Sequence, residues 1–447
     1  MKIRLKLHPP FLLILILICI FSTPAVSQTE EDLQAREETY RKLELFSNVL
    51  SIIQENYVEE IDTNRAIEGA INGMLLSLDP HSAYLSPENF GELQEETQGS
   101  FTGIGIEITV KNGKLTIVSP IEDTPANDAG LQAIDIIVKI DGQWTEDISA
   151  LEAIKKLRGP KGSEVTISVQ RQGWEDLRDF TLVRDVIPVE SVRALFLENG
   201  IAYTRITNFQ SHTTEEYLKS FKDLQRSRKI TSVILDLRNN PGGLLNQAVS
   251  IADLFLESGL IVYTKGRNRE QNMVFQAEKG GTVTEFPLIV LVNEGSASAS
   301  EIVAGAIQDQ KRGLILGTRT FGKGSVQTIV PLQDGSGLRM TTARYFTPSG
   351  RSIQAKGIIP DVEIAFVPNS SPDEQETNGS IPTREKDLPN HFENNSSVNS
   401  SVPPPPDTET QQELTPQESI MLSRLRQDNQ VQTALSILKG VSLLNKK

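Results

Sequence analysis

The chain has 447 residues, 38% of them hydrophobic, which is long enough for two or three domains with ordinary cores. The formal net charge is −14, and it becomes −17 without residues 1–27, which carry Lys2, Arg4 and Lys6 and no acid. A chain this acidic is not expected to bind nucleic acid. The only cysteine, Cys19, lies in the segment expected to be removed, so the mature protein would have no disulfide, no thiol nucleophile and no cysteine-ligated metal, and we expect no cofactor.

Residues 1–27 have the features of a secretory signal peptide. A basic start precedes the apolar run 11–21, and Ala25-Val26-Ser27 forms a small-residue cleavage site. The protein is therefore predicted to be extracytoplasmic, either periplasmic or exported. An uncleaved N-terminal membrane anchor is the alternative, although the 11 residues of the run are fewer than the about 20 that a span needs.

Residues 28–98 are predicted to form an N-terminal helical region. The first helix covers about 31–60, a second covers 64–76, and the turn 79–82 ends it. Two interpretations of the first helix stay open: it packs on its own domain, or it joins two copies in a homodimer. Its apolar residues are spaced three and four apart, as one helix face requires: Leu43, Phe46, Leu50, Ile53 and Tyr57.

Residues 99–185 consist of short alternating strands around a short helix at 125–131, and they resemble a PDZ domain. The strands are expected at 103–108, 115–118, 136–142 and 165–169. One departure is Ile134, where the family usually has glycine. The resemblance implies that a peptide adds as a further strand, and that its terminal carboxylate is bound by the backbone of Gly103, Ile104, Gly105 and Ile106.

Residues 186–367 alternate strands with helices, which predicts a layered α/β core. Strands are expected at 201–206 and 231–237, and the apolar run 287–292 suits a strand buried on both faces. The second strand leads into Pro241-Gly242-Gly243. These glycines either let the backbone approach a ligand closely or only make a tight turn.

A serine-rich turn, 293–300, follows the apolar strand and leads into a helix at 301–309. Such a turn exposes a nucleophile beside the free N–H groups of the helix. Its base could be a histidine or a lysine. His81 and His212 lie in polar turns typical of solvent-facing residues, which favours Lys323.

Lys323 stands between two glycines at the start of a predicted strand, where alternation would place it on one face with Ser325 and Gln327. To act as a base, its pKa must fall from about 10.4 to about 7 or 8, which costs about 4 kcal/mol. A phosphate-binding loop is excluded. That motif needs Lys-Ser and a following helix, and here Lys-Gly-Ser leads into a strand.

After residue 367 the composition changes to Ser, Asn, Pro, Glu and Thr, so 368–415 is predicted to be a disordered tail. A C-terminal helix is expected within 416–447, with Val431, Leu435 and Leu438 on one face at 429–441. It would dock on the core or on a partner. A homodimer would use the N- and C-terminal helices together.

Four segments, 236–245, 293–301, 320–327 and 343–354, resemble the C-terminal processing peptidases, the tail-specific serine proteases with a Ser-Lys dyad. The resemblance spans about 40–366, with the PDZ domain before the core. It implies Ser298 as nucleophile, Lys323 as base and Gln327 as the residue that orients the lysine. It also implies an oxyanion hole from the N–H groups of Gly243 and Ala299, with Gly242 as a further candidate. Ser296 and Ser300 are predicted to be structural, and Arg158 to couple the PDZ domain to the core.

The predicted fold is thus α/β, a layered core of the protease and crotonase-like type with a PDZ domain and an N-terminal helical region. The predicted function is that of a serine endopeptidase. It would capture the free C-termini of extracytoplasmic polypeptides through the PDZ domain and cleave them through an acyl-enzyme. The alternatives are a catalytically silent PDZ scaffold and a non-proteolytic enzyme that uses glycine N–H groups to hold a thioester oxyanion.

Overall fold

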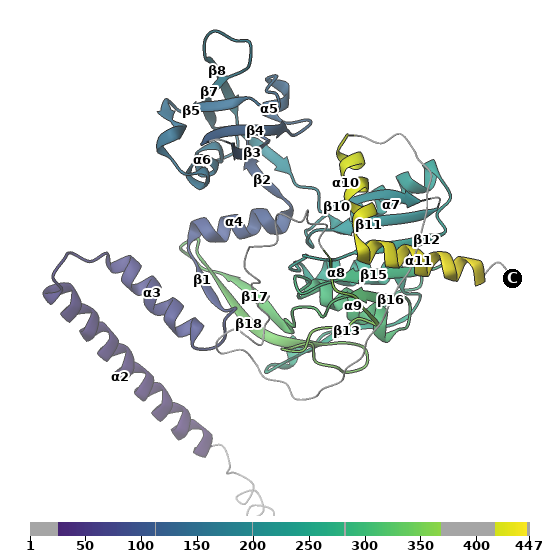
Figure 1. Ribbon diagram of the computed structural model, residues 1–447. Coiled ribbons are helices and arrows are strands. Elements are labelled where there is room, and N and C mark those ends of the chain that lie inside the picture. The colour runs from purple at the N-terminus through teal and green to yellow at the C-terminus, as the bar shows by residue number, and fades with distance from the viewer. Residues whose placement is uncertain (1–25, 112, 199, 281–282, 368–415, 445–447) are drawn as a thin grey trace, which may run out of the picture. The chain divides into compact units, whose positions relative to one another are not determined.

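The computed structural model describes residues 26–111, 113–198, 200–280, 283–367 and 416–444 (Figure 1). The predicted tail, and all but the last two residues of the predicted signal peptide, lie outside these ranges. The chain divides into two units, residues 1–71 and 72–447. None of the described helices is both long and apolar enough to cross a membrane.

The predicted N-terminal helices are present as α2 (Val26–Asn56) and α3 (Thr63–Leu76). Most of the apolar stripe of α2 is exposed, including Leu43, Phe46 and Ile53. The turn predicted at 79–82 precedes β1 (Ala83–Leu85) and α4 (Pro87–Gln98), and the Ser82 hydroxyl donates to Asp79 across it at 2.7 Å. The helix predictions for this region are therefore confirmed.

The predicted PDZ region forms an antiparallel sheet in the order β3-β4-β5-β7-β8, with β6 paired to β5. One side of β3 therefore has no neighbouring strand in the described sheet. A separate pair, β2 and β9, flanks the sheet. The elements are β2 (Ser100–Gly103), β3 (Ile106–Lys111), β4 (Lys114–Pro120), α5 (Pro125–Asp128), β5 (Ile136–Ile140), β6 (Gln143–Trp144), a 3-10 turn (Thr145–Asp147), α6 (Ala150–Leu157), β7 (Glu164–Gln170), β8 (Arg178–Val183) and β9 (Asp185–Pro188).

The single strand predicted at 103–108 is interrupted at Ile104 and Gly105. Their carbonyl groups turn inward and accept hydrogen bonds from the N–H groups of Ala126 and Ile121, both at 2.9 Å. Gly105 takes a φ of +80°, and a Cβ there would lie 2.3 Å from the Cβ of Thr124. A loop therefore separates β2 from β3.

Ile134, which stands where the resembling family has glycine, keeps the turn that glycine would make. Its φ is +72°, and its side chain is exposed. The neighbouring Asp135 is buried, accepts from the N–H of Gln132 at 2.8 Å and pairs with Arg171. These contacts fix the turn although left-handed backbone is unfavourable for a β-branched residue.

The predicted layered core is a six-stranded sheet in the order β10-β11-β12-β15-β16-β19, parallel except for β10. Asp236 of β12 lies beside Leu291 of β15, so both strands end at the same edge. The elements are β10 (Val192–Glu198), β11 (Ile201–Ile206), α7 (Thr213–Ser227), β12 (Ser232–Asp236), α8 (Leu245–Phe255), β15 (Leu288–Val292), α9 (Ala299–Asp309), β16 (Leu314–Gly317) and β19 (Val362–Glu363).

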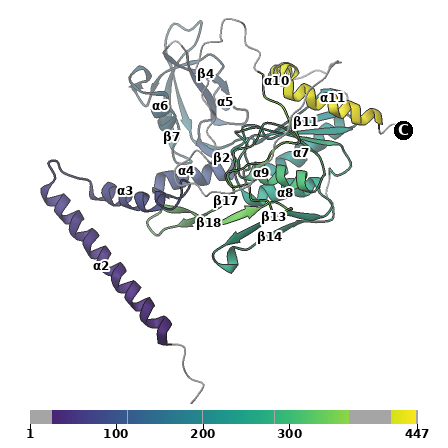
Figure 2. The ribbon, with the colours of Figure 1, turned by 60° about the horizontal axis from the view of Figure 1, so that its bottom comes forward.

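Both faces of this sheet are covered. Alternate residues such as Val233 and Leu235 pack against α7, α8 and α9. Ile234 and Leu291 point to the opposite face and pack against α10 (Pro416–Gln427) and α11 (Asn429–Leu444). Figure 2 shows this C-terminal pair, in yellow, beside β11. The predicted C-terminal helix therefore docks on the core, and Val431, Leu435 and Leu438 are buried there.

A second, antiparallel sheet has a strand that begins just after the predicted lysine. Its order is β1-β18-β13-β14, with β17 paired to β18. Lys323 lies two residues before β17. The prediction that strand alternation places it on one face with Ser325 and Gln327 therefore does not hold for Lys323. The elements are β13 (Gly259–Gly266), a 3-10 turn (Arg269–Gln271), β14 (Val274–Ala277), β17 (Ser325–Pro331) and β18 (Gly337–Phe346).

Candidate active site

The predicted nucleophile, Ser298, lies between β15 and α9 in an unusual backbone conformation. Its φ is +53° and its ψ is −111°, and it directly precedes the first residue of α9. For a residue with a side chain this conformation costs about 1–3 kcal/mol. The N–H of Ala299 is in the first turn of α9 and donates no hydrogen bond within the described chain. A strained serine therefore lies next to a free donor, an arrangement typical of a nucleophile turn.

The Pro-Gly-Gly loop after β12 lies directly against this serine. Gly242 has a φ of +108°, and a Cβ on it would be 2.8 Å from the Cβ of Ser298 and 2.9 Å from the carbonyl oxygen of Ala297. Gly243 has a φ of +138°, and its Cβ would be 2.2 Å from the carbonyl oxygen of Phe209. Only glycine fits at either position, because the loop lies directly against the serine turn and the backbone of Phe209. Approach of this backbone to a ligand stays a prediction.

The two glycines use their N–H groups differently. Phe209 donates to the carbonyl of Gly242 and accepts from the N–H of Leu244, both at 2.8 Å, so the N–H of Gly243 points away from Phe209. It donates to no group in the described part of the chain. The N–H of Gly242 already donates to Oδ1 of Asn240 at 2.9 Å. The expectation that Gly242 supplies an oxyanion donor is therefore corrected: Gly243 and Ala299 offer the two free N–H groups.

Asn240 fastens this loop to the serine turn. Its buried carbonyl accepts from the N–H of Ala297 and from the hydroxyl of Ser300, both at 3.0 Å. The Ser296 hydroxyl donates to the carbonyl of Leu237 at 2.8 Å. Ser296 and Ser300 are thus structural, as predicted, and Ser298 is the serine of the run that they leave between them.

Hydrogen bonds to its backbone groups hold the predicted lysine in place. The carbonyl of Lys323 accepts from the Tyr345 hydroxyl, and its N–H donates to Glu301 at 2.9 Å. Of its flanking glycines, Gly322 has a φ of +102°, and a Cβ on Gly324 would lie 2.6 Å from the backbone nitrogen of Gln354. The glycines therefore let the lysine turn pack closely against neighbouring backbone.

Gln327 and Ser325 share one face of β17, as predicted, because Nε2 of Gln327 donates to the Ser325 hydroxyl at 2.8 Å. This bond fixes the orientation of the amide and leaves its oxygen as an acceptor. His212 lies elsewhere, just before α7, where its exposed ring pairs with Glu215. His81 lies in the turn before β1, where its carbonyl accepts from Arg339.

Glu301 is a site residue that the sequence analysis did not single out. One carboxylate oxygen accepts from the N–H groups of Ser298 and Lys323, each at 2.9 Å. The other accepts from the N–H of Gly322 at 2.8 Å and from the Thr320 hydroxyl at 2.5 Å. One carboxylate thus joins the serine turn to the lysine turn. The spacing Ser-x-x-Glu at a helix start was the pattern that could have revealed it.

Glu301 is completely buried. Burial raises its pKa to about 7. The pKa rises no further because four hydrogen bonds favour the charged form, donated by Thr320, Ser298, Gly322 and Lys323. The carboxyl therefore changes its charge near neutral pH. Among the described residues, no group of three or more His, Cys, Asp and Glu side chains is arranged to hold a metal ion.

Comparisons with known proteins agree with this architecture. Residues 200–364 match "Peptidase family S41", 102–181 match "PDZ domain", and 21–89 match "Activating protease CtpB N-terminal domain". A carboxy-terminal-processing protease of Bartonella bacilliformis is 46% identical over 331 residues, covering 73% of this chain and 76% of that protein. A carboxyl-terminal-processing protease of Synechocystis is 40% identical, covering 69% and 74%.

A solved structure, that of the photosystem II D1 C-terminal processing protease, is 32% identical, covers 72% of this chain and 92% of that one, and has a TM-score of 0.41. The matches and the layered core define a serine peptidase that carries a PDZ domain. The chain belongs to the S41 family of carboxy-terminal processing proteases. The predicted family, fold class and enzyme class are thereby confirmed.

The raised pKa of Glu301 makes core stability pH-dependent. Because the pKa of Glu301 in the folded state, about 7, exceeds the ordinary glutamate pKa of 4.5, the folded state holds an extra proton between these pH values. The contribution of this proton to the free energy of unfolding is about 3 kcal/mol. It is complete below about pH 4.5 and is lost as pH rises through about 7. We expect Glu301→Gln to remove this pH-dependent part of the unfolding free energy. The measurement compares the unfolding free energies of wild type and variant from pH 4.5 to 8. Parallel wild-type and variant curves would contradict the prediction.

Proposed function

We propose that this protease cleaves peptide bonds with Ser298 as nucleophile and Lys323 as base. The observation that carries the proposal is the buried carboxylate of Glu301, which binds the backbone N–H groups of both residues and so holds the two turns together. Neutral Lys323 accepts the proton of Ser298 as the hydroxyl oxygen attacks the peptide carbonyl. The protonated lysine then gives this proton to the leaving amine. Water, deprotonated by the same lysine, releases the acyl group and regenerates the serine.

The N–H groups of Gly243 and Ala299 would stabilise the negative oxygen of the tetrahedral intermediate. Both are free within the described chain; one comes from the glycine loop and the other from the start of α9, and Asn240 holds the two segments together. Donors fixed in advance at the place where charge develops are each worth about 10²–10³ in rate. Gln327, oriented by Ser325, would hold the lysine through its amide oxygen.

Replacing either member of the dyad should abolish proteolysis. We expect Ser298→Ala and Lys323→Ala each to lower kcat by at least about 10³ on an extended polypeptide, with unchanged affinity for a C-terminal peptide. Ser296→Ala is the matched control from the same turn. It removes a hydrogen bond to Leu237 and should retain most of the activity of its folded fraction. Full activity in either dyad variant would refute the assignment, and an inactive wild type would favour the scaffold alternative.

The PDZ domain has a groove suited to an apolar C-terminus. A cavity of about 420 Å³ opens beside the loop before β3, where the N–H groups of Ile104 and Gly105 donate to nothing within the described chain. We propose that these N–H groups bind the terminal carboxylate while the peptide pairs with the open side of β3. Arg158 lies over the ring of Phe101 at 4.9 Å and adds positive charge. The lining also includes one acidic residue, Glu107, and is otherwise apolar: Phe101, Gly103, Ile104, Gly105, Ile106, Ile108, Val118, Ile154 and Leu157.

Peptide binding should therefore need both a free carboxylate and an apolar last residue. We expect a peptide that ends in Val or Leu to lose at least about tenfold in affinity when its C-terminus is amidated or its last residue is Asp. Measurement uses Ser298→Ala so that the peptide is not cleaved. Ile106→Glu should weaken binding similarly, and Val110→Glu, outside the groove on β3, is the control. Equal binding of the acid and the amide would exclude this mode.

We also propose that the substrates are extracytoplasmic and that α2 joins two copies. The sequence of residues 1–27 supports export, and the exposed face of α2 with Leu43, Phe46 and Ile53 supports self-association. N-terminal sequencing of protein from fractionated cells should find a start near Gln28, or residue 1 if the segment is a retained anchor. Leu43→Glu/Phe46→Glu should halve the mass in light scattering. A cytoplasmic location would contradict export, and an unchanged mass would contradict the joining of two copies by α2.

A further inference from the structure

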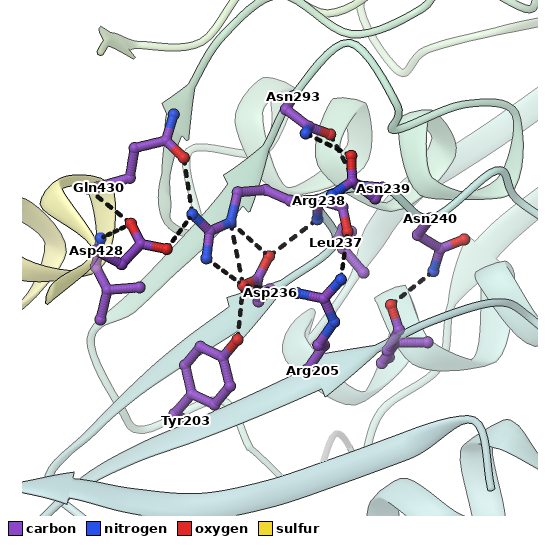
Figure 3. A network of polar contacts seen from close by, with 12 residues as sticks. Tyr203, Arg205, Asp236, Leu237, Arg238, Asn239, Asn240, Asn293, Asp428 and Gln430 are labelled. Atoms are coloured by element: carbon purple, nitrogen blue, oxygen red, sulfur yellow. Dashed lines mark hydrogen bonds and ion pairs between the residues drawn. The ribbon is translucent and has the colours of Figure 1, made fainter. Parts of the chain in front are cut away.

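Arg238 lies at the end of β12, where it connects that strand to the C-terminal helices (Figure 3). Its Nη2 donates to Oδ2 of Asp236 at 2.6 Å, and Nε bonds the same carboxylate. Its Nη1 donates to Oδ2 of Asp428 at 2.7 Å and to Oε1 of Gln430 at 2.8 Å. One guanidinium therefore joins two segments separated by 190 positions.

The cluster is buried and balanced in charge. The side chains of Asp236, Arg238 and Asp428 are 0%, 7% and 11% exposed. Arg205 approaches Asp236 at 3.6 Å, so two cations face two carboxylates. Burial alone would raise the pKa of Asp236, but Arg238 holds it below its usual value. In such surroundings the removal of one charge leaves another without compensation.

Asp428 has two separate contacts. Its Oδ1 accepts from the N–H groups of Gln430 and Val431 at 3.0 and 3.1 Å, which caps the start of α11. Its Oδ2 is the atom that binds Arg238. Gln430 is likewise fixed on both sides, since its Nε2 donates to the carbonyl of Ile364 at 2.7 Å. The corner between α10 and α11 therefore presents two rigid acceptors to the guanidinium.

The backbone leads from Arg238 straight into the loop beside the nucleophile. The carbonyl of Arg238 accepts from Arg205 at 3.2 Å, and the next residue, Asn239, has a φ of +56° and bonds Asn293. Asn240 then contacts the serine turn, and Gly243 carries the free N–H. Arg238 is thus the anchored end of the short segment whose other end is the proposed oxyanion donor.

We propose that Asp428 and Gln430 are positioning residues of the protease, acting through Arg238 to hold the Asn239–Gly243 loop in register with Ser298. The C-terminal helices would then contribute to turnover as well as to the core. This inference rests on the proposed function, because it assumes that Ser298 is the nucleophile and Gly243 an oxyanion donor.

The test uses the full chain, since deleting 416–447 would expose the apolar sheet face that contains Ile234 and Leu291. Asp428→Asn removes the charge but keeps a good helix cap. A displaced donor should cost no more than a lost one, which is worth about 10²–10³ in rate. We therefore expect kcat to fall about tenfold in Asp428→Asn and about 100-fold in Asp428→Asn/Gln430→Met, with KM within about twofold.

A peptide aldehyde provides the second measurement, because its adduct with Ser298 carries an oxyanion. Its affinity should fall by the same factor as kcat, with binding of a C-terminal peptide to the PDZ domain unchanged. Lys439→Gln is the matched control: it breaks the 2.9 Å ion pair of α11 with Glu198, far along the helix from the corner. We expect this variant to keep the kcat and aldehyde affinity of the wild type.

The outcomes distinguish a failure of this inference from a failure of the proposed function. Wild-type kcat and aldehyde affinity in Asp428→Asn, with Ser298→Ala inactive, would overturn the inference and leave the proposed function intact. Equal losses in Asp428→Asn and Lys439→Gln would also overturn it, because they would indicate general docking of the helix. Full activity of Ser298→Ala would instead refute the nucleophile itself.

Discussion

The buried carboxylate of Glu301 is the constraint on which the rest of the site depends. It is the one side chain that accepts from the N–H groups of both Ser298 and Lys323. Those residues lie in two different turns, one before α9 and one before β17. Hydrogen bonds to this one carboxylate, together with the bond from the N–H of Phe321 to the carbonyl of Ser296, therefore set the relative position of the predicted nucleophile and base. Leaving this carboxylate buried without its donors would be costly, which makes the geometry of the two turns and the ionisation of Glu301 interdependent.

The glycine loop has a similar dependence on one residue. Asn240 uses its carbonyl to hold the serine turn and its side chain to bond Gly242 and the carbonyl of Ile206. The loop can approach so closely only because neither Gly242 nor Gly243 has a Cβ. A backbone fixed in this way costs little reorganisation when charge develops beside it, which is the basis of electrostatic catalysis.

The sheet explains why the C-terminal helices belong to the catalytic core. Parallel strands with helices on one face leave the other face apolar, and here Ile234, Ile289 and Leu291 pack against α10 and α11. Covering that face brings the corner of the two helices to the carboxyl end of β12, where Arg238 joins it. The same segment therefore buries an apolar surface and contacts Arg238 after β12.

The sequence by itself determined the order of the domains, the buried strands and the structural roles of Ser296 and Ser300, because these follow from local patterns and from motifs of fixed length. Only the tertiary structure decided that the N–H of Gly242 donates to Asn240 and that Ile134 keeps a left-handed turn. It also decided that Glu301 and Arg238 connect segments distant in the chain. The contacts of Glu301 with Lys323 and of Arg238 with Asp428 depend on which distant segments lie side by side, and no local pattern encodes that arrangement.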